Sequence, residues 1–302
     1  MKLSCSRLLV WLALTLVLTP CVQAGEFEKT FRAKVSAFLI SLDAGQRQRC
    51  LHDVDDDRRW RMHYPGGRRP GIQIRELSQT QRGLMMQALA QVLSPYGIKM
   101  ARAIAAQDAV AGQDALGKYW VTCFGNPSDG SFAFRLAEHH LTFVHLEFAE
   151  GEAREFGPIL LGANPPSLWK DDEQALLDAW KLIDDDSVLI KGKKGIASMP
   201  MPHDVGVLYA DLNKEAQQSL RNIWEKRLSI FTPAIRDRVN QLHEQRGGWG
   251  ESRIAFYNEK PAKRCIDGGR WDFKCGLPGM VWDFEGSRGH IHMSLWVKDA
   301  GE

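Results

Sequence analysis

In two separate parts of the chain, apolar residues recur every three to four positions, which is the spacing of an amphipathic helix. Ser78, followed three residues later by Gln81, forms the capping-box signature of a helix start. The helices predicted in this way cover residues 28–42, 78–93, 97–111, 172–183, 214–231 and 233–245.

Between and after these helices, short runs of β-branched and aromatic residues are separated by glycine, proline and asparagine turns, a pattern typical of antiparallel strands. Along the chain, predicted helices are followed by strands, then by further helices and further strands. This order predicts an α+β fold, in which a mainly antiparallel sheet is covered by helices. No internal repeat is evident, and we expect one domain over residues 25–302. The predicted strands cover residues 119–124, 132–136, 141–148, 156–161, 253–257, 279–284 and 290–297.

The first 24 residues have the pattern of a secretory signal peptide. Lys2 and Arg7 precede an apolar run over residues 8–18, and the segment ends in small residues at Ala24. An apolar run of this length is too short to span a bilayer, which argues against the alternative of an uncleaved membrane anchor. We therefore expect a periplasmic or secreted protein without stable membrane insertion.

Removal of this leader changes the charge and the cysteine content. The whole chain has 39 basic and 37 acidic residues, and Lys2 and Arg7 leave with the leader, so the mature chain is formally neutral. A neutral chain lacks the basic surface that nucleic-acid binding requires. Export also permits disulfides among the four remaining cysteines. We expect a local bridge between Cys265 and Cys275, which leaves Cys50 to pair with Cys123.

Histidines near two predicted strands are the main candidates for chemistry. His290 and His292 lie two apart on a strand, so both side chains point to the same face. His139 and His140 precede another strand, and both can turn toward one site if that strand begins after them. Imidazole ligands suit zinc, copper or iron better than calcium or magnesium. The sequence therefore predicts a transition-metal site; the alternative is that these histidines are hydrogen-bonded core residues.

Candidate catalytic residues are the carboxylates close to these histidines in the sequence. Glu138 and Asp283 are predicted as a further ligand or as the general base of a hydrolytic or oxidative reaction. The sequence contains no H-E-x-x-H motif, no G-x-S-x-G elbow and no P-loop. A different function class, a non-catalytic module that binds carbohydrate or peptide, would use Trp60 and Tyr64; the same aromatic residues can equally pack onto the core.

Seven segments, in this order along the chain, resemble a family of exported proteins called domain of unknown function 3500. They are WRMHYP, GIQIRELSQTQR, LSPYG, YWVTCFGNP, AEHHLTF, LLGANPP and HIHMSLW, and the resemblance covers residues 45–298. The family pattern includes His-His-Leu and a closing His-x-His, which correspond to His139, His140, His290 and His292. The chain departs from that pattern at Glu138, where the family has glycine, and near Trp296, where the family has an arginine. The resemblance implies where the site lies but brings no established reaction.

Overall fold

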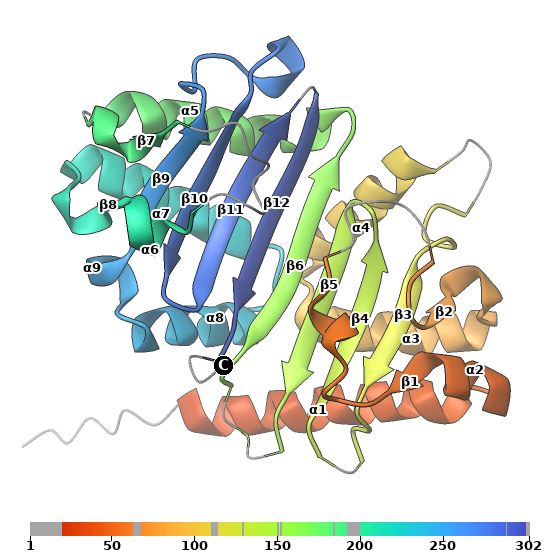
Figure 1. The fold of residues 1–302 in the computed structure, drawn as a ribbon. Helices are drawn as coiled ribbons and strands as arrows, with labels where there is room; N and C mark the ends of the chain where they lie inside the picture. The colour runs from red at the N-terminus through yellow and green to blue at the C-terminus, as the bar shows by residue number, and fades with distance from the viewer. Residues whose placement is uncertain are drawn as a thin grey trace, which may run out of the picture.

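One continuous sheet extends across the molecule, and the longer helices lie behind it in the view of Figure 1. The computed structural model describes residues 20–299, apart from residues 63–67, 110–113, 129, 150, 152, 184, 192–199 and 288. The predicted α+β fold with a mainly antiparallel sheet is confirmed. The helices are α1 (Pro20–Ser41), α2 (Ala44–Cys50), α3 (Gln79–Val92), α4 (Pro95–Asp108), α5 (Lys170–Leu182), α6 (Pro202–Val205), α7 (Lys214–Leu228), α8 (Pro233–Gln245) and α9 (Gly248–Glu251).

The strand order across the sheet is β1-β3-β4-β5-β6-β12-β11-β10-β9-β7, with β2 beside β3 and β8 beside β9. The eight longer strands pair antiparallel with their neighbours, and the two-residue strands β1 and β7 are parallel to β3 and β9. The strands are β1 (Leu51–His52), β2 (Ile72–Gln73), β3 (Trp120–Phe124), β4 (Phe132–Glu138), β5 (Leu141–Glu147), β6 (Phe156–Ala163), β7 (Leu189–Ile190), β8 (Val207–Leu208), β9 (Arg253–Asn258), β10 (Trp271–Leu277), β11 (Met280–Ser287) and β12 (His290–Val297).

The two faces of the sheet differ in chemistry. Side chains that point toward the helices, such as Phe273 and Trp282, belong to the main hydrophobic core. Because side chains alternate along a strand, the residues between them point to the opposite face. On β10, β11 and β12 that face carries Asp272, Lys274, Asp283, His292 and Ser294. The histidines of β12 therefore lie on the polar face of the sheet.

The fold contains a duplication that is not evident from the sequence, which corrects the expectation of no repeat. Each half has a short strand pair (β1 and β2, or β7 and β8), two helices (α3 and α4, or α7 and α8) and a four-stranded meander (β3–β6 or β9–β12). Since β6 pairs antiparallel with β12, a pseudo-twofold axis passes between the halves. Equivalent positions in the two halves are both buried and apolar but have different residues. Examples are the pairs Met85 and Leu220, Ala88 and Ile223, and Leu89 and Trp224.

Backbone hydrogen bonds at the helix corners show the same symmetry. The N–H of Ser94 donates to the carbonyl of Ile230 over 2.9 Å, and the N–H of Thr232 donates to the carbonyl of Val92 over 2.9 Å. Ser94 and Thr232 are the N-caps of α4 and α8, so each bond is the symmetry mate of the other. Residues at the same position in α4 and α8 can therefore be compared directly.

Strand β10 was missed by the sequence prediction, which placed a disulfide-closed loop there. Asp272 and Lys274 alternate with Trp271 and Phe273, and this is the two-residue period of a strand with one polar face. Cys275 lies four residues along β10, about 13 Å from its start. Cys265 lies instead beside Gly286, which is opposite the start of β10.

The predicted disulfides are wrong in this structure. Cys50, Cys123, Cys265 and Cys275 are all free thiols and all buried. The separation of Cys265 and Cys275 along the sheet excludes a bridge, which needs Cα atoms within about 7 Å. Cys50 and Cys123 are neighbours, and burial and this contact raise the pKa of the Cys123 thiol well above its usual value.

Residues 1–19 of the predicted signal peptide lie outside the described residues, and α1 begins at Pro20. Within the described part of the chain, no helix combines the length and the apolar character that crossing a membrane requires. Export itself stays a prediction.

Candidate metal centre

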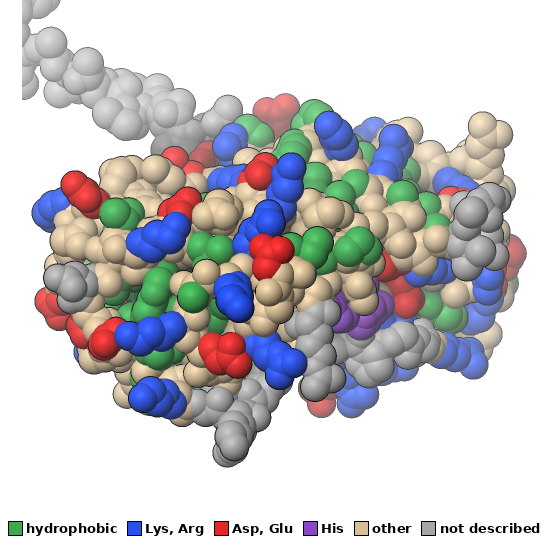
Figure 2. All heavy atoms as spheres, turned by 90° about the horizontal axis from the view of Figure 1, so that it is seen from above, with side chains coloured by type: hydrophobic (Ala, Val, Ile, Leu, Met, Phe, Trp, Pro, Cys, Tyr) green, Lys and Arg blue, Asp and Glu red, His purple; other side chains and the backbone are tan. Residues whose placement is uncertain are grey.

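The four predicted histidines come together at one end of the sheet. His139 and His140 form the two-residue turn between β4 and β5, and His290 and His292 lie at the start of β12. Because β6 lies between β5 and β12 and runs antiparallel to both, the β4–β5 turn and the start of β12 lie at the same end of the sheet. Figure 2 shows histidine side chains at the surface of this end of the molecule.

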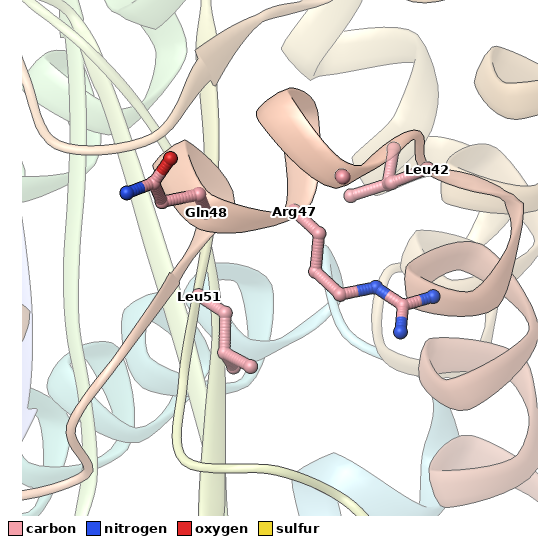
Figure 3. Close-up of a pocket in the computed structure, with 5 residues that line it drawn as sticks. Leu42, Arg47, Gln48 and Leu51 are labelled. Carbon is pink, nitrogen blue, oxygen red and sulfur yellow. The ribbon is translucent and has the colours of Figure 1, made fainter.

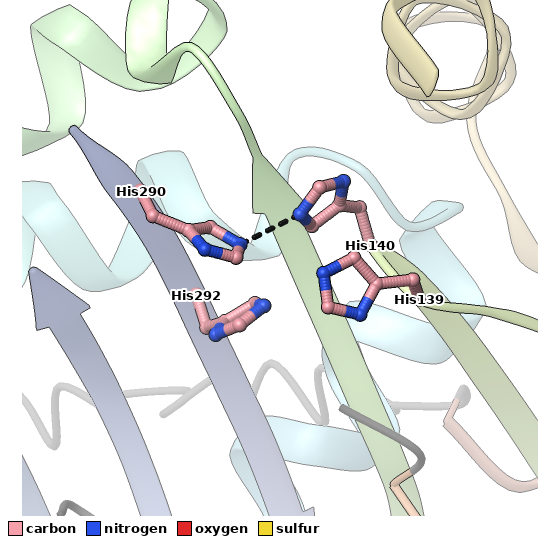
Figure 4. A group of neighbouring side chains, drawn as sticks. All are labelled: His139, His140, His290 and His292. Atoms are coloured by element: carbon pink, nitrogen blue, oxygen red, sulfur yellow. Dashed lines mark hydrogen bonds between the residues drawn. The ribbon is translucent and has the colours of Figure 1, made fainter. Parts of the chain in front are cut away.

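The imidazole rings point toward one another (Figure 4). One ligand atom from each of the four histidines lies within 4.8 Å of all the others. Nε2 of His140 is 2.7 Å from Nε2 of His290. Ligands about 2.1 Å from a tetrahedral metal lie about 3.4 Å from one another. The 2.7 Å contact and the 4.8 Å upper limit lie on either side of this separation.

Gly162 on β6 provides the space in which two of the rings meet. A Cβ atom at this position would lie 2.7 Å from Cδ2 of His140 and 2.8 Å from Cδ2 of His292. The backbone cannot move away easily, because the N–H of Gly162 donates to the carbonyl of His140 and its carbonyl accepts from the indole N–H of Trp169. Only a residue without a side chain fits between these imidazoles.

Two carboxylates contact the outer nitrogens of the more buried histidines. Nδ1 of His140 lies 2.5 Å from Oδ1 of Asp108, the last residue of α4. Nδ1 of His292 lies 3.4 Å from Oε2 of Glu285, which is directly opposite on β11. Histidine ligands of metals usually have such a carboxylate or carbonyl partner, which leaves Nε2 for the metal. Asp108, Glu285 and Gly162 were not predicted from the sequence.

Protonation of two of the four histidines is suppressed by their surroundings. Burial, together with the neighbouring imidazoles, lowers the pKa of His139 to about 4, and burial and His292 and His140 lower that of His290 to about 4. The His140 hydrogen bond holds the pKa of Asp108 below its ordinary value, although burial opposes this. At neutral pH these two imidazoles are therefore uncharged, the state that binds metal ions.

The donor set fits a transition-metal ion. Imidazole nitrogens are ligands that zinc, copper and iron accept. Nδ1 of His139 is buried and has no hydrogen-bond partner among the described residues. A buried ring nitrogen without a partner is costly, and a bound metal ion would satisfy it. The structure thus brings together a histidine group that could hold a metal ion, as the sequence predicted.

The predicted catalytic carboxylates lie close by but outside this group. Glu138 is buried, and its Oε2 lies 3.3 Å from Nη1 of Arg69; burial raises the pKa of the Glu138 carboxyl. Asp283 accepts hydrogen bonds from both the backbone N–H and the hydroxyl of Ser294, at 2.7 Å each. These bonds place Asp283 in the junction between β11 and β12. Their catalytic roles stay predictions.

His145 does not join the site, because its side chain points to the helix-covered face of the sheet. Its ring packs edge-on against Phe27 and Phe31 of α1, and its Nε2 lies 2.6 Å from Oε1 of Glu147. His145 and Glu147 thus belong to a separate buried network beneath α1.

The aromatic residues of the alternative binding function are placed differently from the histidines. Trp60 is half-buried, with the guanidinium of Arg59 and the ammonium of Lys298 each 5.2 Å from its ring. Arg135 donates to the carbonyls of Arg58 and Arg61 and so fixes this segment on the sheet. Tyr64 lies outside the described residues.

A hollow elsewhere on the surface lacks comparable chemistry. It lies where α1 ends and α2 and β1 begin (Figure 3). Arg47 is its charged residue, and the guanidinium already donates to the carbonyl of Leu39. The hollow is lined by Leu42, Ala44, Arg47, Gln48 and Leu51.

A family model described as Protein of unknown function (DUF3500) matches residues 25–182, just over half of the chain. The chain belongs to this family. The matched region of the DUF3500 model includes His139, His140, Asp108 and Gly162, whereas His290 and His292 lie beyond it. No curated protein and no solved structure matches the chain.

The lowered histidine pKa values predict how the metal-free protein responds to acid. Unfolding returns His139 and His290 to an ordinary pKa of about 6.5, so between pH 6.5 and 4 the unfolded state binds more protons than the folded state. Stability should therefore fall as pH decreases through this window and stop falling from this cause below pH 4. Urea unfolding in a chelator, from pH 7 to 4, measures it.

The matched control is the double variant His139→Gln and His290→Gln, which removes both groups while leaving hydrogen-bonding side chains. Its stability should depend less steeply on pH over the same range. Equal slopes for the two proteins would show that these histidines are not held neutral by the fold.

Proposed function

We propose that this protein is an exported metal-dependent enzyme whose metal centre is formed by His139, His140, His290 and His292. The observation that carries the proposal is the convergence of these four side chains, within 4.8 Å, from segments about 150 residues apart. The turn between β10 and β11, which is the symmetry mate of the β4–β5 turn, contains Pro278 and Gly279 instead. A duplicated fold does not by itself require histidines at these positions.

The exposure of the rings favours catalysis over a purely structural role. His140 is 4 % exposed and His292 9 %, whereas His139 and His290 are half-buried, on the outer side of the group. Structural metal sites are closed by their ligands, and catalytic sites keep a position open for water or substrate. Catalysis at this group therefore requires a five-coordinate ion, or one of the four histidines left unbound. His139 and His290 are thus the two rings of the group that solvent reaches more easily.

The chain's own residues define what the centre can do. A divalent ion held by neutral imidazoles keeps its full charge and supplies Lewis-acid activation of a water or a substrate oxygen; copper or iron would add oxidative chemistry. Asp108 and Glu285 hold the two inner rings, and Glu138 lies next to His139 as the candidate general base. Burial raises the pKa of the Glu138 carboxyl, which is the direction that makes a carboxylate a stronger base.

Metal analysis of the full-length protein, exported and purified without chelators, tests the proposal. Wild type should contain close to one equivalent of zinc, copper or iron, and His290→Ala should contain less than about a tenth of that, because one of the four nitrogens is lost. His203→Ala is the control: His203 lies on α6, outside the group, and its side chain is 31 % exposed. This variant should retain the wild-type metal content.

Two results would contradict the proposal. A wild-type protein that neither contains these metals nor takes them up on titration would exclude the metal centre. The metal-loaded protein would also be assayed for chelator-sensitive turnover of chromogenic esters, phosphoesters and amides, and of oxygen with a reductant. If it turns over none of these, the protein binds a metal but does not catalyse these reaction classes.

A further inference from the structure

We propose that Asp108 is the positioning residue of the metal centre, and this inference rests on the proposed metal-binding function. Its carboxylate would fix His140 in the tautomer that carries the proton on Nδ1. Nε2 of His140 would then always carry the lone pair, and this lone pair would face the other three histidines. Asp108 would act through His140 and would not itself touch the metal ion.

The contact between the two residues has the required geometry. Oδ1 of Asp108 lies 2.5 Å from Nδ1 of His140, and the side chains are 9 % and 5 % exposed. A neutral imidazole has one N–H and one lone pair, so an Nδ1–H that donates to the carboxylate leaves the lone pair on Nε2. That Nε2 is the atom 2.7 Å from Nε2 of His290.

The position of Asp108 in α4 is unfavourable for helix stability, which suggests a different reason for its presence. Asp108 is the last residue of α4, where the helix dipole favours a cation and disfavours a carboxylate. Lys118 compensates in part by donating to the main-chain carbonyl of Asp108 over 2.8 Å.

The duplicated helix α8 provides an internal comparison. Both helices begin with a proline, Pro95 in α4 and Pro233 in α8, and thirteen residues later the first has Asp108 and the second Arg246. Arg246 donates to the main-chain carbonyls of residues 154 and 298, beside a turn that has no histidine. The helix end beside the histidines thus has a carboxylate, and its symmetry mate has the cation that a helix end favours.

The two inner carboxylates also balance the charge of the ion. Four neutral imidazoles contribute no charge, whereas Asp108 and Glu285 together contribute two negative charges next to the ligands. These charges would offset part of the charge of a bound cation, Asp108 more than Glu285, because the Asp108 side chain is 9 % exposed and that of Glu285 is 26 % exposed.

Asp108→Asn tests the inference because asparagine keeps the size of the side chain and an acceptor oxygen but loses the charge. Zinc affinity, measured by competition with a chromophoric chelator, should fall by about 10- to 100-fold. The visible absorption bands of the Co²⁺-loaded protein should shift, since the donor strength of His140 changes. The control Asp237→Asn removes an exposed carboxylate of α8 and should match wild type in both measurements.

The outcomes separate this inference from the proposed function. If wild type binds zinc and Asp108→Asn binds it equally tightly with an unchanged Co²⁺ spectrum, the positioning role is overturned and the metal centre stands. If wild type binds neither ion, both are overturned. If Asp108→Asn fails to fold, Asp108→Ser is measured by the same two criteria; weakened binding supports the inference, and unchanged binding overturns it.

Discussion

Gly162→Ala should abolish tight metal binding while the protein remains folded. The added methyl group would lie 2.7 and 2.8 Å from carbons of His140 and His292, so both rings must move outward. Asp108 holds one ring at 2.5 Å, and metal–ligand distances tolerate deviations of only about 0.2 Å. We expect the zinc affinity to fall by at least about 100-fold, measured by chelator competition, since two of four ligands are displaced together.

Gly83→Ala is the matched control for this change. Gly83 lies in α3, where a Cβ atom would meet nothing within 4 Å, so the variant should bind metal like wild type and unfold at the same or a slightly higher temperature. Circular dichroism of Gly162→Ala should show a folded protein, because alanine fits an extended strand. Wild-type affinity in Gly162→Ala would mean that the metal, if bound, is not held by the rings of both His140 and His292.

The sequence was informative about the histidines because strand periodicity is local. Two histidines separated by one residue on a strand must share a face, and His290 and His292 do. For His139 and His140, the prediction depended on the strand starting just after them, and β5 begins at Leu141. The alternation of side chains along β5 places His145 on the helix-covered face of the sheet, where its ring packs against Phe27 of α1.

The supporting residues could not be found in this way, because they come from other elements. Asp108 is one of 37 acidic residues and lies 32 positions from His140. Asp108 lies near the end of the predicted helix 97–111, and such a position does not indicate which residue it contacts. Gly162 was not recognised either, since only the packing of β5, β6 and β12 shows what its missing side chain makes room for.

The duplication was hidden for a related reason. A packed core requires apolar volume rather than identical residues, so equivalent positions such as Leu89 and Trp224 diverge without changing the fold. The functional site differs still more, because a metal centre requires particular residues in one half only. Sequence comparison within the chain therefore lacks the signal that the strand order provides.

Arg238→Met should lower the free energy of unfolding by about 3–5 kcal/mol, the largest stability effect we expect. Arg238 donates from Nη1 and Nη2 to the two oxygens of Glu147, at 2.9 and 3.2 Å, and from Nη2 to Glu28 at 2.9 Å. The Glu147 side chain is only 2 % exposed. Burial opposes the charge of Glu147, but the nearby His145 and Arg238 lower the pKa of its carboxyl, so methionine would leave a buried anion without its cation.

Arg49→Met is the matched control for Arg238→Met, because the Arg49–Glu76 pair joins the same residue types at 2.6 Å but its side chains are 46 % and 34 % exposed. Its removal should change stability by less than about 1 kcal/mol, since water screens the pair and solvates the remaining charge. Adding Glu147→Gln to Arg238→Met should restore much of the loss, as the uncompensated charge is gone. Urea unfolding of all four proteins measures these differences. If Arg238→Met lowers the free energy of unfolding no more than Arg49→Met does, Arg238 is not needed to compensate the buried charge of Glu147.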